Sequence, residues 1–436
     1  MADTHEPNRV MIYDFIIVGG GVSALAFAST LPKDCKYLII EHGKAHDERD
    51  RDHPFDSMSG LSGAGLYSDG KFSFYPSAEK VYFLDNSEAA YALLVADLTG
   101  LLDDIPAYPT LVNVPTKNNE WFLKKYPSKY MSLENRFALV DRLLARIPKA
   151  ALITETRVSS VTQYHMNDVT GPLFIVSTDK SVYVTKNVVF AGGRFSSIDY
   201  PFKKVFRRFE FGVRIQTPSD NTVMTKCRQI DPKFRYIVTA DDTDPNGTNQ
   251  ERLKEFRTFC TIRKGEIVKT VHPLQSQLPG ALESAWDSFA YGPNTSITTF
   301  SGRADCQPTE LSNFGFNVIV AQESDYSPKD LALITSIPPF VKPLSEFTGN
   351  EYQHLSPLLM GGLTKLLERF PGLDAPDTTV HGPTIEGVGY YPAEDRPPGV
   401  HVIGDCSGVY RGIIAAMISG YTLAITLRPD CTLIRT

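Results

Sequence analysis

The stretch "YDFIIVGGGVSALAFASTLPKDCKYLIIEHG", Tyr13 to Gly43, decides the fold of this chain. It opens with "YDFIIVG", a continuous apolar run that ends in glycine and is typical of a buried parallel strand. An alanine-rich segment then predicts a helix that ends at Pro32, and "KYLIIE" predicts a second buried strand. Strand, helix and strand in about thirty residues form a βαβ unit, which indicates an α/β domain with a parallel sheet.

The turn between the first strand and the helix carries a dinucleotide-binding pattern. Gly19, Gly21 and Ala24 form G-x-G-x-x-A, in which the glycines allow a tight turn and a close approach to a pyrophosphate. Glu41, at the end of the second strand, is placed to accept hydrogen bonds from ribose hydroxyls. The alternative is a tight turn without a ligand. The predicted binding residues here are Gly19, Gly21, Val22, Ser23, Ala24, Glu41 and, at the rim, His42.

A second strand–loop–helix pattern, "GVHVIGDCSGVYRGIIAAMISG" from Gly399 to Gly420, favours FAD as the dinucleotide. Asp405 can accept a hydrogen bond from a ribitol hydroxyl, and the helix that starts at Gly412 offers free N–H groups to a reduced flavin. The alternative is a buried helix capped by glycine. A third strand-to-glycine turn, "VVFAGGRFSS", lies at Val188–Ser197. These segments add Ala191, Gly192, Gly193, Gly404, Asp405, Gly412, Ile413 and Ile414 to the predicted FAD-binding residues, and Val158, in "ETRVSSV", is added as a contact of the adenine.

The remaining pattern predicts two domains. Amphipathic helices are expected at Glu88–Leu102 and Glu134–Pro148, followed by a β-meander that returns to a buried strand. From Pro201 to Asp377 strand-like segments alternate with polar loops, which is typical of an antiparallel sheet with covering helices. We therefore predict an α/β fold: a Rossmann-like FAD-binding domain, 1–200 and 378–436, and an inserted α+β substrate domain with an antiparallel sheet, 201–377.

Composition and charge limit the partners and the cellular location that we expect for the protein. The 436 residues carry a net charge of −6, which argues against a dedicated nucleic-acid binder, so the basic "FKKVFRR" is read as a solvated face. The six cysteines form no CxxC pair, and no secretory signal opens the chain. The longest apolar run, Gly412–Leu427, is too short for a bilayer. A cytoplasmic protein without a membrane partner or a bound metal is expected.

The motifs together resemble those of flavoproteins of the glutathione-reductase structural type, and more closely a bacterial family of uncharacterised FAD-dependent dehydrogenases. The resembling stretches include "IIVGGGVSAL", "GAGLYSDGKF", "FEFGVRIQTP" and "HVIGDCSGVYRGIIAAMISG", and they are spread over almost the whole chain. No second G-x-G-x-x-G is present, so a separate nicotinamide domain is not expected. An external electron donor or acceptor would therefore reach the flavin directly or through a partner.

The resemblance implies that the glycine-rich loop Gly60–Lys71 passes over the pyrophosphate and beside the flavin. Its glycines allow a close backbone approach, Ser68 can donate a hydrogen bond, and Asp69-Gly70 forms a turn. The predicted contacts are Gly63, Ala64, Gly65, Ser68, Asp69 and Gly70.

Two residues are candidates for catalysis. Lys71 could place a cation near a reduced flavin or an anionic substrate, or it could be an ordinary surface lysine. Arg214 lies in an otherwise apolar strand, where a buried guanidinium needs a partner: a structural salt bridge or a substrate. Cys260 is interpreted as a small buried hydrophobe rather than a nucleophile.

Four functions fit the sequence. The first is an FAD-dependent dehydrogenase that transfers a hydride between a small-molecule substrate and flavin N5. The others are a flavin monooxygenase, a flavoenzyme that modifies nucleic acid, and a flavin-binding scaffold without turnover.

Overall fold

The computed structural model describes residues 11–112, 115–164, 171–199, 203–221, 229–239, 252–273 and 296–427. The chain has a mixed α/β architecture with one mixed sheet and separate antiparallel sheets. The βαβ unit is present as β1 (Ile12–Val18), α1 (Val22–Ala28) and β2 (Tyr37–Ile40), with β1 and β2 parallel. α1 ends before Pro32, because the chain leaves the helix at Ser29.

The mixed sheet has the strand order β6-β2-β1-β9-β8-β7, and β18 also pairs with β9. The strands β1, β2, β6, β9 and β18 run parallel to one another, whereas β8 is antiparallel to both β9 and β7, so that β7, β8 and β9 form the predicted meander. The bounds are β6 (Leu152–Ile153), β7 (Val158–Tyr164), β8 (Leu173–Thr178), β9 (Val182–Phe190) and β18 (Val400–Val402).

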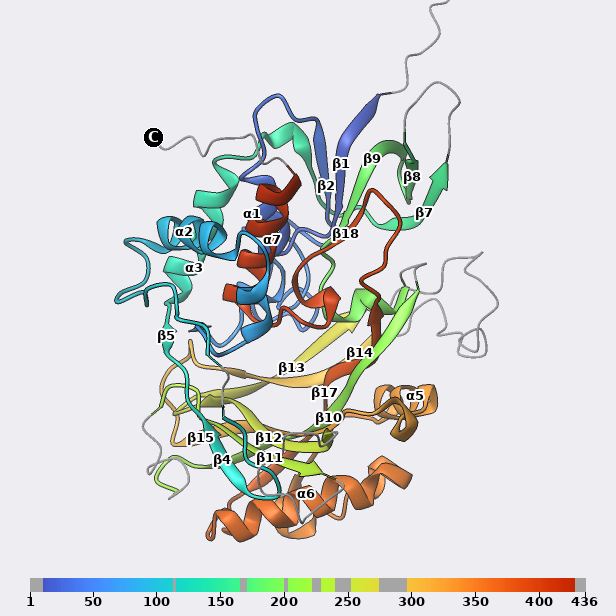
Figure 1. Cartoon of the computed structure of the whole chain (residues 1–436). Helices are drawn as coiled ribbons and strands as arrows, with labels where there is room; N and C mark the ends of the chain where they lie inside the picture. The colour runs from blue at the N-terminus through green and yellow to red at the C-terminus, as the bar shows by residue number, and fades with distance from the viewer. Residues whose placement is uncertain are drawn as a thin grey trace, which may run out of the picture.

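The helices α1, α2, α3 and α7 lie together on one side of this sheet (Figure 1). Phe15 and Ile17 of β1 share one apolar core with α1 and α7, whereas Ile16 packs with the meander on the other face. This alternation is what a strand covered on both faces requires. No helix in the described ranges is both long and apolar enough to cross a membrane. Besides α1, the helices are α2 (Ser87–Leu98), α3 (Leu133–Leu144) and α7 (Ile413–Leu427).

The second large sheet is antiparallel, in the order β16-β17-β10-β15-β12-β11-β4, and α5 and α6 lie beside it (Figure 1). The bounds are β4 (Trp121–Lys124), β10 (Lys204–Pro218), β11 (Lys233–Thr239), β12 (Arg252–Ile262), β15 (Leu311–Val320), β16 (Phe340–Pro343), β17 (Thr379–Pro392), α5 (Pro328–Ser336) and α6 (Ser356–Arg369).

The two faces of the antiparallel sheet differ in character. In β10, Phe209, Phe211 and Val213 belong to the apolar core that includes α6, and Arg208 and Arg214 line a cavity on the opposite side. Successive side chains of a strand point to opposite faces, so the charged residues of β10 are collected on the face toward the mixed sheet. This face positions the candidate site.

Smaller elements complete the fold. The domain boundaries remain a prediction. The sheet that contains β10 also includes β4 and β17, and the sequence analysis assigned the residues of both strands to the FAD-binding domain. The two-stranded sheets are β3 (Lys71–Ser73) with β5 (Ser128–Tyr130), and β13 (Glu266–Pro273) with β14 (Ser296–Arg303). Short 3-10 helices are η1 (Gly63–Gly65), η2 (Glu79–Phe83), η3 (Lys149–Ala151), η4 (Arg194–Asp199), η5 (Glu323–Asp325), η6 (Leu344–Glu346), η7 (Asn350–Leu355) and η8 (Gly404–Ser407).

Candidate functional site

A cavity of about 1090 Å³ is lined by residues of both large sheets. Its floor includes the ends of β1, β2 and β9, and its roof includes β10, β11, β12 and β17. Pockets for small molecules and cofactors hold about 300–1,000 Å³. The cavity is thus large enough for a cofactor together with a small ligand.

The turn after β1 is built for close contact. Gly19 has a φ of +99°, and a Cβ there would lie 2.7 Å from the Cα of Gly192, so a side chain is excluded on both grounds. Gly21 lines the cavity, with Ala191 O at 3.7 Å from its would-be Cβ. The Gly21 backbone also forms a bridge with Ser62. The turn and the glycine-rich loop are therefore held side by side.

Glu41 is buried, and it organises the end of β2. One carboxylate oxygen accepts from the Gly20 amide at 2.7 Å and the other from the Gly43 amide at 2.8 Å. Burial raises the pKa of Glu41, but the hydrogen bonds and the neighbouring His42 outweigh burial and bring the pKa down to about 2. The carboxylate is ionised at neutral pH and retains lone pairs for a further donor.

The glycine-rich loop is ordered by two buried arginines from elsewhere in the chain. Arg49 donates to the carbonyl oxygens of Leu61 and Gly63, both at 2.9 Å. Arg136 donates to Leu66 O at 2.6 Å and to Ser68 O at 2.8 Å. Because these contacts fix the carbonyl groups, the loop is a rigid wall of the cavity rather than a flexible surface segment.

The far end of this loop is anchored to the antiparallel sheet. Lys71 Nζ lies 3.1 Å from Asp69 and 3.6 Å from Asp231, and it donates to Thr261 O. Burial lowers the pKa of Lys71, but Asp69 and Asp231 outweigh burial and raise it. The surface-lysine alternative is wrong, since only 7% of this side chain is exposed. Asp69 also accepts from the Cys260 thiol at 3.1 Å.

Arg214 is buried at 1% exposure and lines the cavity. Its Nε donates to Asn313 Oδ1 and its Nη2 to Cys260 O, both at 2.7 Å. No carboxylate of a described residue lies within 4.0 Å of the guanidinium, so the structural salt bridge considered from the sequence is not formed within these residues. Among the described residues, only neutral acceptors contact this charge.

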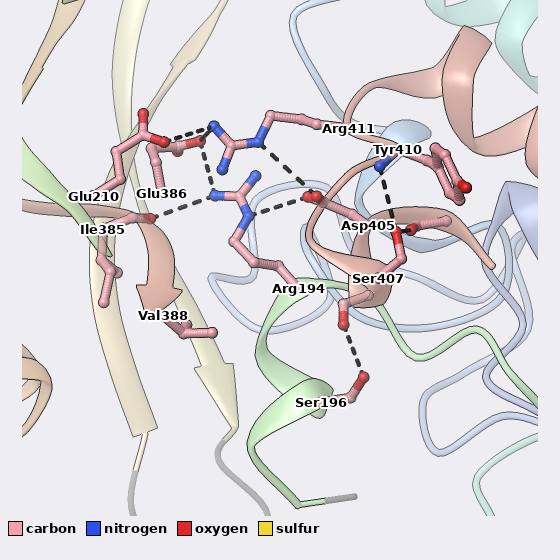
Figure 2. A network of polar contacts seen from close by, with 12 residues as sticks. Arg194, Ser196, Glu210, Ile385, Glu386, Val388, Asp405, Ser407, Tyr410 and Arg411 are labelled. Carbon is pink, nitrogen blue, oxygen red and sulfur yellow. Dashed lines mark hydrogen bonds and ion pairs between the residues drawn. The ribbon is translucent and has the colours of Figure 1, made fainter. Parts of the chain in front are cut away.

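An ion-pair network joins the two large sheets near the start of α7 (Figure 2). Arg194 bridges Glu386 at 2.8 Å and Asp405 at 3.1 Å. Arg411 lies beside it and pairs with Glu210 at 3.2 Å and with Glu386 at 3.3 Å. The Oδ1 atom of Asp405 is buried and accepts no hydrogen bond from a described residue. Arg411 Nε lies 3.9 Å from this oxygen, too far for a hydrogen bond, so the oxygen can still accept one from a further donor.

Most of the predicted site residues line this one cavity, and some do not. Ala24, Gly70, Gly404 and Ile414 lie outside the lining, where they have packing roles. A Cβ on Gly70 would lie 2.7 Å from Met131 O, for example. The cavity brings together Gly19, Gly21, Val22, Ser23, Glu41, His42, Gly63, Ala64, Gly65, Ser68, Asp69, Lys71, Val158, Ala191, Gly192, Gly193, Arg214, Asp405, Gly412 and Ile413.

Sequence reasoning missed much of the roof. Arg194, Glu210, Arg257 and Glu386 take part in ion pairs at the cavity, and none was predicted as a site residue. The signal that could have found Glu210 is the period-two alternation of charge and aromatic residues in "RRFEFGVR". The partners on β12 and β17 carry no comparable local signal.

Comparisons with known proteins give only distant structural likenesses. No protein-family model and no curated protein sequence matches the chain. Among solved structures, NikD, an amino acid oxidase, aligns over 98% of this chain and 96% of its own, with 12% identity and a TM-score of 0.41. Halogenase PltM aligns over 96% and 68%, with 12% identity and a TM-score of 0.40.

OTEMO in complex with FAD and NADP aligns over 43% of this chain and 27% of its own, with 15% identity and a TM-score of 0.25. The aligned part of this chain thus spans about a quarter of OTEMO. At these values the likenesses do not define a common activity, and the function is argued from the site.

Proposed function

We propose that the chain is an FAD-dependent oxidoreductase with a Rossmann-like cofactor domain, and that it transfers a hydride between a small-molecule substrate and flavin N5. The observation that carries the proposal is the single cavity that joins Glu41, the glycine-rich loop and Asp405. Glu41 and the loop come from the start of the chain and Asp405 from near its end, and each matches a different portion of FAD. The strands of the roof form the opposite wall of the cavity, where a substrate could bind.

The residues present fit FAD. Gly412 has a φ of +93°, and its would-be Cβ meets nothing within 4 Å, so its backbone is open to the cavity. Asp405 Oδ1 offers a buried acceptor for a ribitol hydroxyl. Glu41 would accept from the ribose, and the backbone of Gly63 and Gly65 leaves space for the pyrophosphate. FAD, when bound, would supply the ring that accepts or donates the hydride.

The chain itself would bind, orient and shield the reactants. Lys71 stays protonated at neutral pH because Asp69 and Asp231 raise its pKa, so it would hold the end of the glycine-rich loop rather than supply a proton. The ion pairs of Glu210 and Glu386 fix the roof rigidly, which favours precise positioning of a substrate. The electron donor or acceptor would be a small molecule or a partner that reaches this cavity.

The nucleic-acid alternative gains no support from the basic segment that raised it. Lys203 pairs with Asp395 at 3.0 Å and Arg207 with Glu394 at 3.4 Å. Arg208 turns toward Glu210 at 3.6 Å and lines the cavity. These side chains do not form an unpaired basic surface for a phosphate backbone.

Anaerobic photoreduction of the bound flavin, followed by a screen of metabolites, oxidants and NAD(P)⁺, tests the proposal. We expect one class of small molecule to reoxidise the flavin faster than buffer alone. Reoxidation by dioxygen with formation of a hydroxylated product would instead identify a monooxygenase. A flavin that no metabolite or carrier reoxidises would contradict an enzymatic role and leave a binding scaffold.

A further inference from the structure

The cavity has a charge opposite to that of the chain. The whole chain has a net charge of −6, yet the cavity is lined by thirteen lysines and arginines and by seven aspartates and glutamates. The diphosphate of FAD would offset only part of this positive excess. A basic cavity in an acidic protein concentrates anions from solution and binds them.

Arg214 differs from the other arginines on the roof. Arg235 pairs with Glu255 at 2.7 Å, and Arg257 and Arg411 pair with Glu210. Arg214 is almost fully buried, with only 1% of the residue exposed, and it has no carboxylate partner in the described part of the chain. Burying a charge without a partner of opposite charge costs free energy, so Arg214 does not stabilise the fold and is better explained by binding of an anion.

Packing holds the guanidinium in a fixed orientation. A Cβ on Gly302 of β14 would lie 2.0 Å from Arg214 Nη2, so the hairpin backbone packs directly against it. Its Nε and Nη2 are used by Asn313 and Cys260, and Nη1 makes no hydrogen bond with a described residue. An oxyanion in the cavity would find donors that are already positioned.

Apolar rings flank this group on both sides. In the sheet register Arg214 lies between Gly315 of β15 and His381 of β17. The Phe259 ring covers Gly315, where a Cβ would lie 2.1 Å from it, and Phe300 contacts the His381 ring at 5.7 Å. Phe259 and Phe300 both line the cavity. A ligand with a negatively charged group at one end and an apolar body would match this arrangement.

We propose that the substrate carries a carboxylate on an apolar body, and that Arg214 binds this carboxylate between Phe259 and Phe300. The Nη1 group, which makes no hydrogen bond with a described residue, can donate a charge-assisted hydrogen bond to a carboxylate oxygen. Phosphate, which carries more charge, would need a second cation close to Arg214. Lys71 is committed to Asp69 and Asp231, and the described residues show no contact of Lys233 with Arg214. This inference rests on the proposed function, because it names the substrate class of the same site.

The test measures the melting temperature and the flavin absorbance of the purified protein during titration with benzoate, benzyl alcohol or phenyl phosphate at constant ionic strength. We expect benzoate to raise the melting temperature and perturb the flavin spectrum, and benzyl alcohol to do neither. Arg214→Met should raise the benzoate Kd roughly ten- to a hundredfold, because charge-assisted hydrogen bonds are lost. Arg214→Lys should give an intermediate Kd, and Arg369→Met, on the exposed face of α6, should match the wild type.

Three results would overturn the inference. They are benzoate binding that is unchanged in both Arg214 variants, equal binding of benzyl alcohol, and tighter binding of phenyl phosphate than of benzoate. The Arg214→Lys variant keeps the test valid if Arg214→Met does not fold. Failure of the proposed function is seen separately: the protein would then contain no flavin, whereas the melting temperature still reports on anion binding.

Discussion

Replacing Glu210 with glutamine should weaken the junction of the two sheets. Glu210 is fully buried, and it contacts Arg257, Arg411 at 3.2 Å and Arg208 at 3.6 Å. Glutamine keeps the shape of the side chain and an acceptor for Asn317, so the change removes mainly the charge. Removing one partner of a buried ion pair typically costs about 3–5 kcal/mol.

The expected effect on melting follows from the length of the chain. An unfolding entropy of roughly 2.1 cal/mol/K per residue gives about 0.9 kcal/mol/K for a chain of 436 residues. The Glu210→Gln variant should therefore melt about 3–5 °C below the wild type in calorimetry at pH 7. The matched control is Glu394→Gln, which removes an exposed partner of Arg207 and should change stability by less than about 1 kcal/mol.

The pH dependence gives a second check on the same residue. Burial raises the pKa of Glu210, but Arg257, Arg411 and Arg208 outweigh burial and lower it. The stabilisation is therefore present above the unfolded-state pKa of about 4.3 and is lost as the pH falls further. The gap between wild type and variant should narrow below that pH. Equal melting of both proteins at pH 7 would refute this reasoning.

Three further predictions concern the cavity. Gly65→Val should abolish flavin retention with the fold intact, since a Cβ at Gly65 would already lie 3.2 Å from Ile413. The control is Gly361→Val: a Cβ at Gly361 would meet nothing within 4 Å, so this variant should keep full flavin absorbance. Burial lowers the pKa of Lys233 to about 7, so this lysine gains its charge as the pH falls through that value. Because Lys233 and Arg214 line the same cavity, benzoate should then bind more tightly at pH 6 than at pH 8 by up to about fivefold, and equal Kd values would contradict this effect of Lys233. Burial raises the pKa of the Cys260 thiol to about 11, so native protein at pH 8 should resist alkylation there; rapid labelling detected by mass spectrometry would show a reactive thiolate instead.

The local parts of the fold could be predicted from the sequence. The run Tyr13–Val18, the glycines that follow and the strand ending at Ile40 carry their structure in residues that are neighbours in the chain. The apolar helix after Gly412 is read in the same way, because continuous burial and continuous hydrophobicity coincide in α7. Such segments are short-range and therefore visible to pattern analysis.

The parts that depend on distant contacts could not be predicted. Arg49 and Arg136 stabilise the glycine-rich loop from outside it, and nothing in their own surroundings in the sequence indicates this. Glu210 meets Arg411, two hundred and one residues further along, only because β10 and the start of α7 face the same cavity. Side-chain pairing across sheets follows from the tertiary arrangement, so the charges on the roof were visible in sequence but their partners were not.

The strand composition of the second sheet shows the same limit. The alternation in β10 predicts a two-faced strand, but its neighbours β17 and β15 are separated from it by long stretches of chain. β4, at the edge of the same sheet, comes from a segment between two other elements of the first half of the chain. Strand order depends on non-local pairing, which hydrophobic periodicity alone does not encode.

The most direct test of the central claim is the flavin content of the purified protein. After denaturation and removal of the polypeptide, the supernatant is separated by chromatography and the flavin is measured by absorbance and fluorescence against FAD and FMN standards. The structure predicts FAD in a ratio close to one per chain, either as purified or after incubation with FAD. A colourless protein that releases no flavin and does not bind added FAD would contradict the proposed function.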